Sequence, residues 1–404
     1  MRGFRSMSLE GPRPLPKSEV MFETLNARPK RGIPVRQPQI FVTQPLAPEA
    51  SKVGARMQGI LSRHQFTNFG PLHNELESEL AARIAVGHFS LWNNGTNALM
   101  GALSQLDLSG QVIVTPFTFP ATVQTIAMLG LEPVFADIDP ETLTLSPESA
   151  RDRTSAKTSA VIGTHIYGTQ CDTDALWQLR DETGMRVIYD GAHSLGQEQP
   201  YFDTREGVLG DVTMLSFHAT KLLHTVEGGG LLTYDSELHR RFVRARNFGF
   251  EAEDAPAGLA LNGKLSEVHA AIGLEVLPLV EHEIECRSSL AREYSHLLSE
   301  MPGLKIQSGL GASKQYFVVR IKETEFGASR DDVWSDLRAH GYMARRYFYP
   351  LCSDIPGFTE FPFASDLPVA RAAVQECLAL PFYGRLDRSH LQSVAEIIAA
   401  RHRT

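Results

Sequence analysis

Two kinds of hydrophobic pattern alternate along most of the chain. Short runs rich in β-branched and other apolar residues, each bounded by Gly, Pro or Asp, predict β-strands. The longer segments between them carry apolar residues at helical spacing and predict α-helices. The predicted strands span residues 112–115, 133–136, 160–164, 187–189 and 212–217, and the predicted helices span residues 72–85, 97–106, 121–129 and 175–183. This alternation predicts an α/β fold with a mostly parallel sheet sandwiched by helices, in which ligands bind at the carboxyl ends of the strands.

The pattern changes after about residue 275. A helical stretch covers residues 275–300, a strand is predicted at 316–321, and Ser329 with Asp332 has the form of a capping box that opens a helix. The tail then alternates helix with the short apolar segment 377–382. We therefore predict a large domain over residues 38–275 and a smaller C-terminal α+β domain over residues 276–404.

Residues 1–37 differ from both regions, because they hold five prolines interleaved with Lys and Arg. Prolines at this density interrupt helices and sheets, so the segment is predicted to be a basic, Pro-rich arm that is disordered or extended. A solvated extension explains its charge, and no function is assigned to it.

Charge and cysteine content narrow the classes of function. The chain has 404 residues, 39 Lys and Arg against 47 Asp and Glu, and a formal net charge of -8. The acidic balance argues against a surface that binds nucleic acid throughout, although a local basic patch stays open. The four cysteines are far apart and form no CxxC pair, so neither a disulfide framework nor a cysteine zinc site is indicated. No apolar stretch is long enough to span a membrane, and we expect a cytoplasmic protein without membrane insertion.

Three polar segments follow predicted strands or open predicted helices. Residues 93–99 read NNGTNAL, a glycine turn and a hydroxyl before a helix, which could form a phosphate cup from the first-turn amides. The alternative is an ordinary turn in which Thr96 or Asn97 caps the helix. Asp190 follows the buried run 187–189 and is expensive to bury without a cation or several donors. It could instead cap a helix, or form half of a metal site with His193, but no third ligand stands at suitable spacing and no metal is predicted.

The third segment contains Lys221, which stands a few residues after a predicted strand and close to Ser216. Most lysines are simply exposed. A lysine that loses water in a pocket has a lowered pKa and becomes a nucleophile. The glycines of EGGG, residues 227–230, would let the backbone approach a ligand closely.

Together these segments match the needs of pyridoxal 5'-phosphate. This cofactor requires a lysine for its aldehyde, a carboxylate for its pyridine nitrogen and a phosphate cup. It also requires an apolar or aromatic side chain on the ring, which Phe119 could supply by stacking. Each segment alone is weak evidence, but the set in this order is a strong indication.

At this point the chain resembles a known family, the DegT-type nucleotide-sugar aminotransferases, which are fold-type I pyridoxal-phosphate enzymes. The resemblance runs from about residue 39 to the C-terminus and rests on NFGPLHNELE, NNGTNAL, TPFTFPAT, PVFADIDP, YDGAHSLG, GDVTMLSFHATK, EGGG and LNGKLSEVHAAIGL. Within the family the SFHATK and NGK segments are most similar to those of the dTDP-4-amino-4,6-dideoxyglucose transaminases. A role in O-antigen or other polysaccharide biosynthesis is implied.

The resemblance also implies roles for individual residues. Lys221 would be the Schiff-base lysine and Asp190 the partner of the pyridine nitrogen. The other cofactor contacts would be Ser216, Thr96 and the amide of Asn97 at the phosphate, Phe119 stacked on the ring, His193 near the ring or its 3-hydroxyl, and Asn262 at the phosphate of the neighbouring subunit. A homodimer with shared active sites follows from the last of these contacts.

Substrate contacts are less well defined by the sequence. The resemblance implies that Lys264 is a substrate residue on the sugar side, at a position where many members carry an aromatic residue or an arginine. Arg345 and Arg346 begin the segment RRYFYP and could grip a carboxylate or a diphosphate, or could belong to a basic loop that packs against the rest of the protein. His165 also ends a predicted strand, and we interpret it as a hydrogen-bonded structural residue.

The expected activity is transamination from L-glutamate to a nucleoside-diphosphate-linked 4-keto-6-deoxyhexose, which yields a 4-amino-4,6-dideoxy sugar nucleotide. Some relatives carry histidine in place of the Schiff-base lysine and catalyse dehydration, which Lys221 argues against. The alternatives are transamination of a 3-keto sugar or a keto-cyclitol, and a non-catalytic regulator that retains the fold. The intact set of Lys221, Asp190 and Ser216 argues against the regulator, since a binding module needs no such lysine.

Overall fold

The computed structural model describes residues 39–84, 87–195, 208–252, 255–256, 258, 260–307 and 314–402. The arm predicted for residues 1–37 lies outside these ranges. Residues 39–404 group as one compact unit, and the predicted division at residue 275 stays a prediction.

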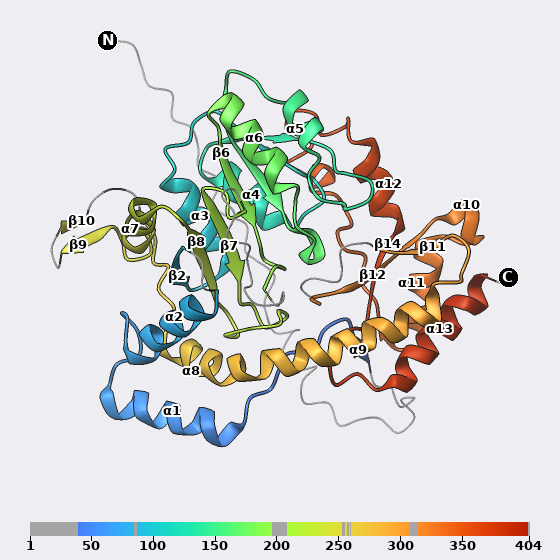
Figure 1. Cartoon of the computed structure of the whole chain (residues 1–404), viewed down its shortest axis with the longest axis horizontal. Helices are drawn as coiled ribbons and strands as arrows, with labels where there is room; N and C mark the ends of the chain where they lie inside the picture. The colour runs from blue at the N-terminus through green and yellow to red at the C-terminus, as the bar shows by residue number, and fades with distance from the viewer. Residues whose placement is uncertain are drawn as a thin grey trace, which may run out of the picture. The chain divides into compact units, whose positions relative to one another are not determined.

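A seven-stranded mixed sheet forms the centre of this unit, with the strand order β2-β8-β7-β6-β5-β3-β4 (Figure 1). Its strands are β2 (His88–Trp92), β3 (Gln111–Val114), β4 (Glu132–Phe135), β5 (Thr158–Thr164), β6 (Arg186–Asp190), β7 (Val212–Ser216) and β8 (Gly229–Thr233). Strands β3 to β7 pair in parallel, and β8 runs antiparallel to both β7 and β2. The expected α/β fold is confirmed. The pattern missed β2 and β8, and β8 opens with glycines, which are depleted in strands.

Alternate side chains of the strands enter hydrophobic clusters on opposite faces of the sheet. Val112 and Val114 pack into one cluster, and Ile113 between them packs into another. The first face is covered by α3 (Gly95–Ser104), α4 (Pro120–Met128) and α7 (Ser236–Ala245). The other face is covered by α5 (Pro147–Asp152) and α6 (Thr173–Thr183), and further along by α2 (Pro71–Ile84) and α8 (Glu267–Val276). The sheet is therefore buried on both sides, as a parallel sheet requires.

A smaller antiparallel sheet follows, formed by β11 (Leu304–Ile306), β12 (Phe317–Ile321) and β14 (Cys377–Leu380). One of its faces packs on α9 (Val280–Leu298), α11 (Arg330–Ala339) and α13 (Arg388–His402). The other face joins the cluster of the large sheet through Tyr316, Val318 and Ala379, together with α12 (Pro368–Glu376). The two sheets therefore share one continuous core.

Two details of the C-terminal region test the sequence pattern. The capping box is present, because Ser329 Oγ accepts from the Asp332 N–H while Asp332 Oδ2 accepts from the Ser329 N–H.

The single helix predicted over residues 275–300 is wrong. Helix α8 ends at Val276 and α9 begins at Val280, and the 3-10 turn Leu277–Leu279 between them contains Pro278. Proline cannot donate the helical hydrogen bond.

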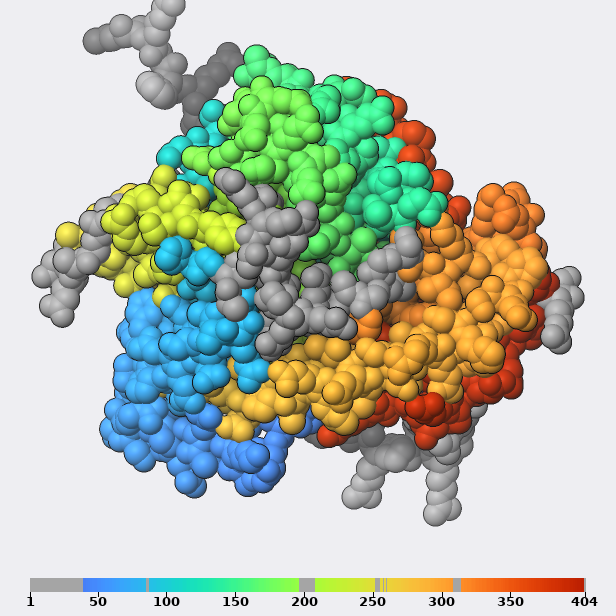
Figure 2. Space-filling model, in the orientation of Figure 1, coloured from blue at the N-terminus to red at the C-terminus, as the bar shows by residue number. Residues whose placement is uncertain are grey.

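Helix α1 and several short elements complete the described chain. Helix α1 (Ala50–Arg63) packs beside α8, and both lie along the same side of the space-filling view (Figure 2). The remaining elements are β1 (Ile40–Phe41) paired with β13 (Tyr342–Met343), β9 (Phe250–Ala252) paired with β10 (Ala255–Pro256), η3 (Ile166–Gly168), α10 (Glu323–Phe326) and η5 (Cys352–Asp354). Among the described residues, no helix is long and apolar enough to cross a bilayer.

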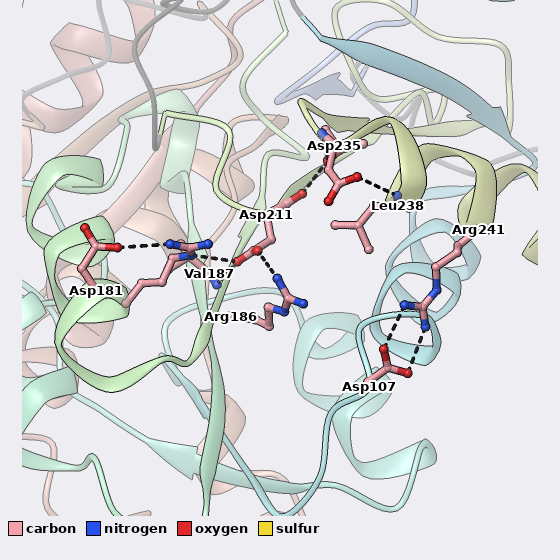
Figure 3. A network of polar contacts seen from close by, with 10 residues as sticks. Asp107, Asp181, Arg186, Val187, Asp211, Asp235, Leu238 and Arg241 are labelled. Atoms are coloured by element: carbon pink, nitrogen blue, oxygen red, sulfur yellow. Dashed lines mark hydrogen bonds and ion pairs between the residues drawn. The ribbon is translucent and has the colours of Figure 1, made fainter.

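A polar network around Asp211 ties the amino ends of β6 and β7 together (Figure 3). Asp211 Oδ1 accepts from Arg186 Nη1 at 2.8 Å, and Oδ2 accepts from the Val187 N–H, also at 2.8 Å. Arg180 Nε lies 3.7 Å from the same carboxylate, and the Asp211 carbonyl accepts from Thr233 Oγ1 at 2.8 Å. These contacts fix the register of β6, β7 and β8 at the end of the sheet opposite Asp190 and Ser216.

Replacing Asp211 by Ala should lower the free energy of unfolding by about 1–3 kcal/mol, since it leaves a buried N–H of Val187 without its acceptor. Urea denaturation of the purified protein measures this change. Asp211→Asn keeps one acceptor oxygen and should recover part of the loss. An unchanged denaturation midpoint for Asp211→Ala would contradict the role of the network.

Candidate active site

The carboxyl ends of β5, β6 and β7 meet the amino ends of α3 and α4 around a cavity of about 380 Å³. The predicted residues that line it are Thr96, Phe119, Asp190, His193, Ser216, Lys221 and Arg345. Asn97, Asn262, Lys264 and Arg346 are not among its lining residues in the described chain. Segments more than a hundred residues apart in the sequence therefore meet where the fold predicts a ligand.

Asp190 is the last residue of β6 and is only 4% exposed. Its Oδ1 accepts from the Ala192 N–H at 3.0 Å, and its Oδ2 accepts from Thr122 Oγ1 at 2.6 Å. Burial raises the pKa of this carboxyl, while the two hydrogen bonds and the charge of Lys221 act in the opposite direction. The carboxylate is therefore desolvated but not unpaired.

Lys221 lies on a turn that follows β7. The Lys221 N–H donates to the His218 carbonyl at 2.8 Å, and Gln315 braces the turn by donating to the Thr220 carbonyl and accepting from the Leu222 N–H. Burial lowers the pKa of Lys221 to about 8, although Asp190 raises it. A substantial fraction of the amine is thus neutral near pH 8, the form that attacks a carbonyl carbon.

His193 lies in the turn after β6, and its ring is buried. Its Nδ1 accepts from the Tyr167 N–H at 3.2 Å. Burial lowers the pKa of His193 well below its usual value, and the charge of Lys221 lowers it further. A neutral ring that accepts at Nδ1 must carry its proton on Nε2, so His193 can donate one hydrogen bond from that atom.

The amino end of α3 forms another part of the cavity wall. Asn94 caps this helix by accepting from the Asn97 N–H at 2.7 Å, so the amide of Asn97 already has a partner. Gly95 and Thr96, the two preceding helical residues, line the cavity beside Ser216. First-turn amides and hydroxyls together make an anion site.

The glycine run at the start of β8 allows this helix end to approach the sheet. A Cβ on Gly229 would lie 2.5 Å from the Asn94 carbonyl carbon, which no real side chain tolerates. On Gly230 it would lie 2.3 Å from the Phe89 ring. Within the described chain, these two glycines therefore serve packing around the site, while Gly228 lines the cavity itself.

An aromatic wall encloses the side of the cavity nearest the small sheet, and the sequence reasoning missed it. The ring of His193 stacks on Phe348 with centroids 6.0 Å apart and meets the edge of Tyr316 at 5.1 Å. Tyr316, Tyr347 and Phe348 all line the cavity. The only indication of this wall in the sequence was the aromatic segment RRYFYP, which contains Tyr347 and Phe348. Phe119, in contrast, is 61% exposed although it lines the cavity.

The remaining predicted residues lie outside the cavity. The exposed Asn262 accepts from Asn93 Nδ2 through its carbonyl at 2.9 Å, next to the α3 turn. Lys264 Nζ sits over the Phe248 ring at 4.3 Å. Arg346 pairs with Asp331 at 3.1 Å.

His165 is structural, as interpreted from the sequence. Its Nδ1 accepts from the Cys171 N–H at 3.1 Å, and its ring stacks on Tyr189.

The donor set fits pyridoxal phosphate. A desolvated amine and a buried carboxylate share one cavity, and hydroxyls stand at a helix terminus where a phosphate can bind. The fold and this site define a transferase of the pyridoxal-phosphate class.

Comparison with known proteins identifies the family. Residues 49–399 match the model of the DegT/DnrJ/EryC1/StrS aminotransferase family, and the chain belongs to that family. It is therefore a pyridoxal-phosphate-dependent aminotransferase, which confirms the expected enzyme class and cofactor.

Three relatives illustrate the match. The dTDP-4-amino-4,6-dideoxy-D-glucose transaminase of Shigella dysenteriae is 36% identical over 363 residues, covering 89% of this chain and 98% of the relative. An enzyme of the same description from Escherichia coli is 33% identical, with 90% and 98% covered. The structure of DesI with its TDP-sugar product superposes with a TM-score of 0.83 at 31% identity, covering 91% of this chain and 96% of that one.

Lys221 should react with an acylating reagent at lower pH than ordinary lysines do. Only the neutral amine reacts, and burial lowers the pKa of Lys221 to about 8. Trace labelling of the cofactor-free protein with acetic anhydride at a series of pH values, read by mass spectrometry, measures the midpoint. In Asp190→Asn the midpoint should fall, since the carboxylate that favours the charged amine is lost. A midpoint for Lys221 at or above pH 10 would contradict a desolvated lysine; exposed Lys157 provides the reference peptide.

Proposed function

We propose that this protein transfers an amino group from L-glutamate to a nucleoside-diphosphate-linked 4-keto-6-deoxyhexose, giving a 4-amino-4,6-dideoxy sugar nucleotide. The observation that carries the proposal is that a desolvated Lys221 and a buried Asp190 line the same cavity. The choice of sugar is supported by the two transaminases that are 36% and 33% identical over nearly their whole length.

Lys221 and Asp190 would perform the chemistry. When bound, pyridoxal phosphate supplies an electron sink that stabilises negative charge at the carbon next to the reacting nitrogen. Lys221 would hold the cofactor through its aldehyde carbon and, once released, move a proton between the substrate carbon and the cofactor carbon. Asp190 would accept the N–H of the pyridine ring and keep that nitrogen protonated.

The walls of the cavity would orient the cofactor. The Thr96 and Ser216 hydroxyls would hold the phosphate with the first-turn amides of Gly95 and Thr96, which replace the Asn97 amide because Asn94 already occupies it. His193 would donate from Nε2 to the oxygen on the ring. Phe119 would stack on the ring, which would cover part of its large exposed surface.

A homodimer with shared active sites would complete the phosphate site. The side chain of Asn262 is exposed, and its backbone is tied to Asn93 directly beside the α3 turn. A second copy of the chain that approached this edge would bring its own Asn262 toward the phosphate. The four cysteines are free thiols, which supports a cytoplasmic location. A 28% identical relative from Bacillus subtilis, named as a spore coat polysaccharide biosynthesis protein, supports a role in polysaccharide biosynthesis.

Arg345 is the substrate residue that the geometry favours. It is exposed and lines the cavity beside Tyr347, so its guanidinium can grip a carboxylate or a phosphate of the substrate. Arg346 already pairs with Asp331 and lies over the rings of Trp334 and Tyr349. Lys264 would contribute only if a second subunit or the substrate reached it.

The proposal is tested with purified protein and a panel of nucleotide-linked 4-keto sugars, 3-keto sugars and keto-cyclitols. We expect amino transfer to a 4-keto-6-deoxyhexose nucleotide, with one 2-oxoglutarate released from L-glutamate for each amino sugar formed. Transfer to 3-keto sugars or cyclitols alone would overturn the proposed substrate and leave the enzyme class intact.

Lys221→Ala should abolish multiple-turnover transamination, because no other described residue in the cavity carries an amine. The borohydride-sensitive visible absorbance of the wild-type protein with pyridoxal phosphate should be lost as well. Circular dichroism checks that the variant is folded. Sustained turnover by a folded Lys221→Ala protein would refute the assignment.

Arg345→Ala should raise the KM of a substrate by about 10-fold or more, because a charge-assisted hydrogen bond is lost. Arg346→Ala is the matched control, since its side chain is engaged by Asp331 outside the cavity. Steady-state kinetics with each substrate varied in turn shows whether Arg345 serves the donor or the nucleotide sugar. Equal effects of the two substitutions would contradict a specific contact by Arg345.

A further inference from the structure

Three buried threonine hydroxyls form a chain of contacts that ends on the Asp190 carboxylate. Thr164 Oγ1 donates to Thr118 Oγ1 at 3.1 Å, and Thr118 Oγ1 lies 3.3 Å from Thr122 Oγ1. Thr122 Oγ1 donates to Asp190 Oδ2 at 2.6 Å. All four side chains are buried and line the cavity.

When Asp190 is ionised, its charge fixes the direction of every hydrogen bond in this chain. An ionised carboxylate can only accept hydrogen bonds, so Thr122 must donate its single hydroxyl proton to Asp190. Thr122 can then only accept from Thr118, and Thr118 can only accept from Thr164. All three O–H dipoles therefore point toward the carboxylate, and hydrogen bonds aligned in this way strengthen one another.

The fold assembles this chain from three separate segments. Thr164 ends β5 and is the register partner of Asp190 on the neighbouring strand β6. Thr118 lies in the loop before α4, and Thr122 lies in the first turn of that helix. The loop is held in place by the Cys352 thiol, which donates to the Thr118 carbonyl at 3.3 Å.

A second threonine on α4 shows that the hydrogen bond from Thr122 to Asp190 differs from the usual hydrogen bond of a helical threonine. Thr125, also buried and on the same helix, turns its hydroxyl back to the Thr122 carbonyl at 2.9 Å. This local bond is the usual choice of a helical threonine. Thr122 reaches across to another strand and meets the one buried carboxylate that lines the cavity within the described chain.

We infer that the Thr164–Thr118–Thr122 chain is a positioning device that keeps the Asp190 carboxylate ionised and holds it at a fixed angle toward the cofactor ring. Thr122 occupies one oxygen and the Ala192 N–H the other, so the carboxylate cannot rotate without losing a bond. Oriented hydroxyl dipoles replace part of the solvation that burial removes. The inference rests on the proposed roles of Asp190 and the cofactor.

The inference is tested first in the cofactor-free protein by a double-mutant cycle. Thr122→Val removes the hydroxyl with little change of shape. In the wild-type background it should raise the unfolding equilibrium constant by about 10-fold or more, because the buried charge loses a donor. In an Asp190→Ala background the same change should have little effect, since no charge remains to be solvated. Equal effects in both backgrounds would overturn the inference.

The second test measures the loaded enzyme. Thr122→Val should raise the dissociation constant for pyridoxal phosphate by about 10-fold and lower kcat by about 10- to 100-fold. The KM for L-glutamate should change little, because a positioning residue acts through Asp190. Thr122→Ser, which keeps the hydroxyl, should restore both values.

Matched substitutions separate this role from packing. Thr125→Val removes a buried hydroxyl from the same helix and should leave cofactor affinity and kcat near wild type. Thr118→Val and Thr164→Val should show smaller losses in the order of their distance from Asp190. If Thr122→Ser is as poor as Thr122→Val, or Thr125→Val is equally harmful, the inference fails.

Failure of the inference can be told from failure of the proposed function. Wild-type protein that does not bind pyridoxal phosphate would refute the function. Wild-type protein that binds and transaminates normally, while Thr122→Val matches it in cofactor affinity, kcat and unfolding, would refute only the threonine chain.

Discussion

The site depends on the burial of a carboxylate and an amine of opposite charge in the same cavity. Burial disfavours the charged form of each group, so it raises the pKa of Asp190 and lowers the pKa of Lys221 to about 8. Each charge partly offsets the cost for the other. The balance yields a lysine that can be neutral and a carboxylate that can stay ionised, which are the two states that pyridoxal-phosphate chemistry needs.

The large sheet makes this arrangement possible by its topology. Because β5, β6 and β7 run in parallel and lie side by side, Thr164, Asp190 and Ser216 end neighbouring strands at one edge. Asp211 and its arginines fix the strand register at the opposite edge. A shift of one residue would turn Asp190 into the hydrophobic cluster on the other face. The network far from the cavity therefore supports its geometry.

The small sheet completes the site rather than standing apart from it. Gln315, just before β12, braces the turn that carries Lys221, and Tyr316 beside it meets the ring of His193. The buried Arg287 on α9 donates to the Gln315 carbonyl and pairs with Glu283 at 2.6 Å. Rigid support of this kind matters because a catalytic lysine must be held within a narrow range of positions to react.

The sequence by itself determined the features that depend on local pattern. Alternating strands and helices predicted the α/β fold, and a polar residue at the end of an apolar run marked Asp190, Ser216 and Lys221 for one ligand site. These features can be predicted from the sequence because a strand or a helix start is encoded within a few neighbouring residues. The motifs also supplied the family resemblance that the comparisons confirmed.

Only the tertiary structure decided which distant side chains meet at the cavity. Nothing in the local sequence around Tyr316, Phe348 or Gln315 shows that they face His193 and Lys221, and nothing around Thr118 shows that it joins Thr164 to Thr122. The folded chain also decides that the Asn97 N–H donates to the Asn94 side chain, so this amide belongs to the helix cap and not to the phosphate site. These contacts depend on strand order, register and the packing of two sheets on one core, which are properties of the folded chain as a whole.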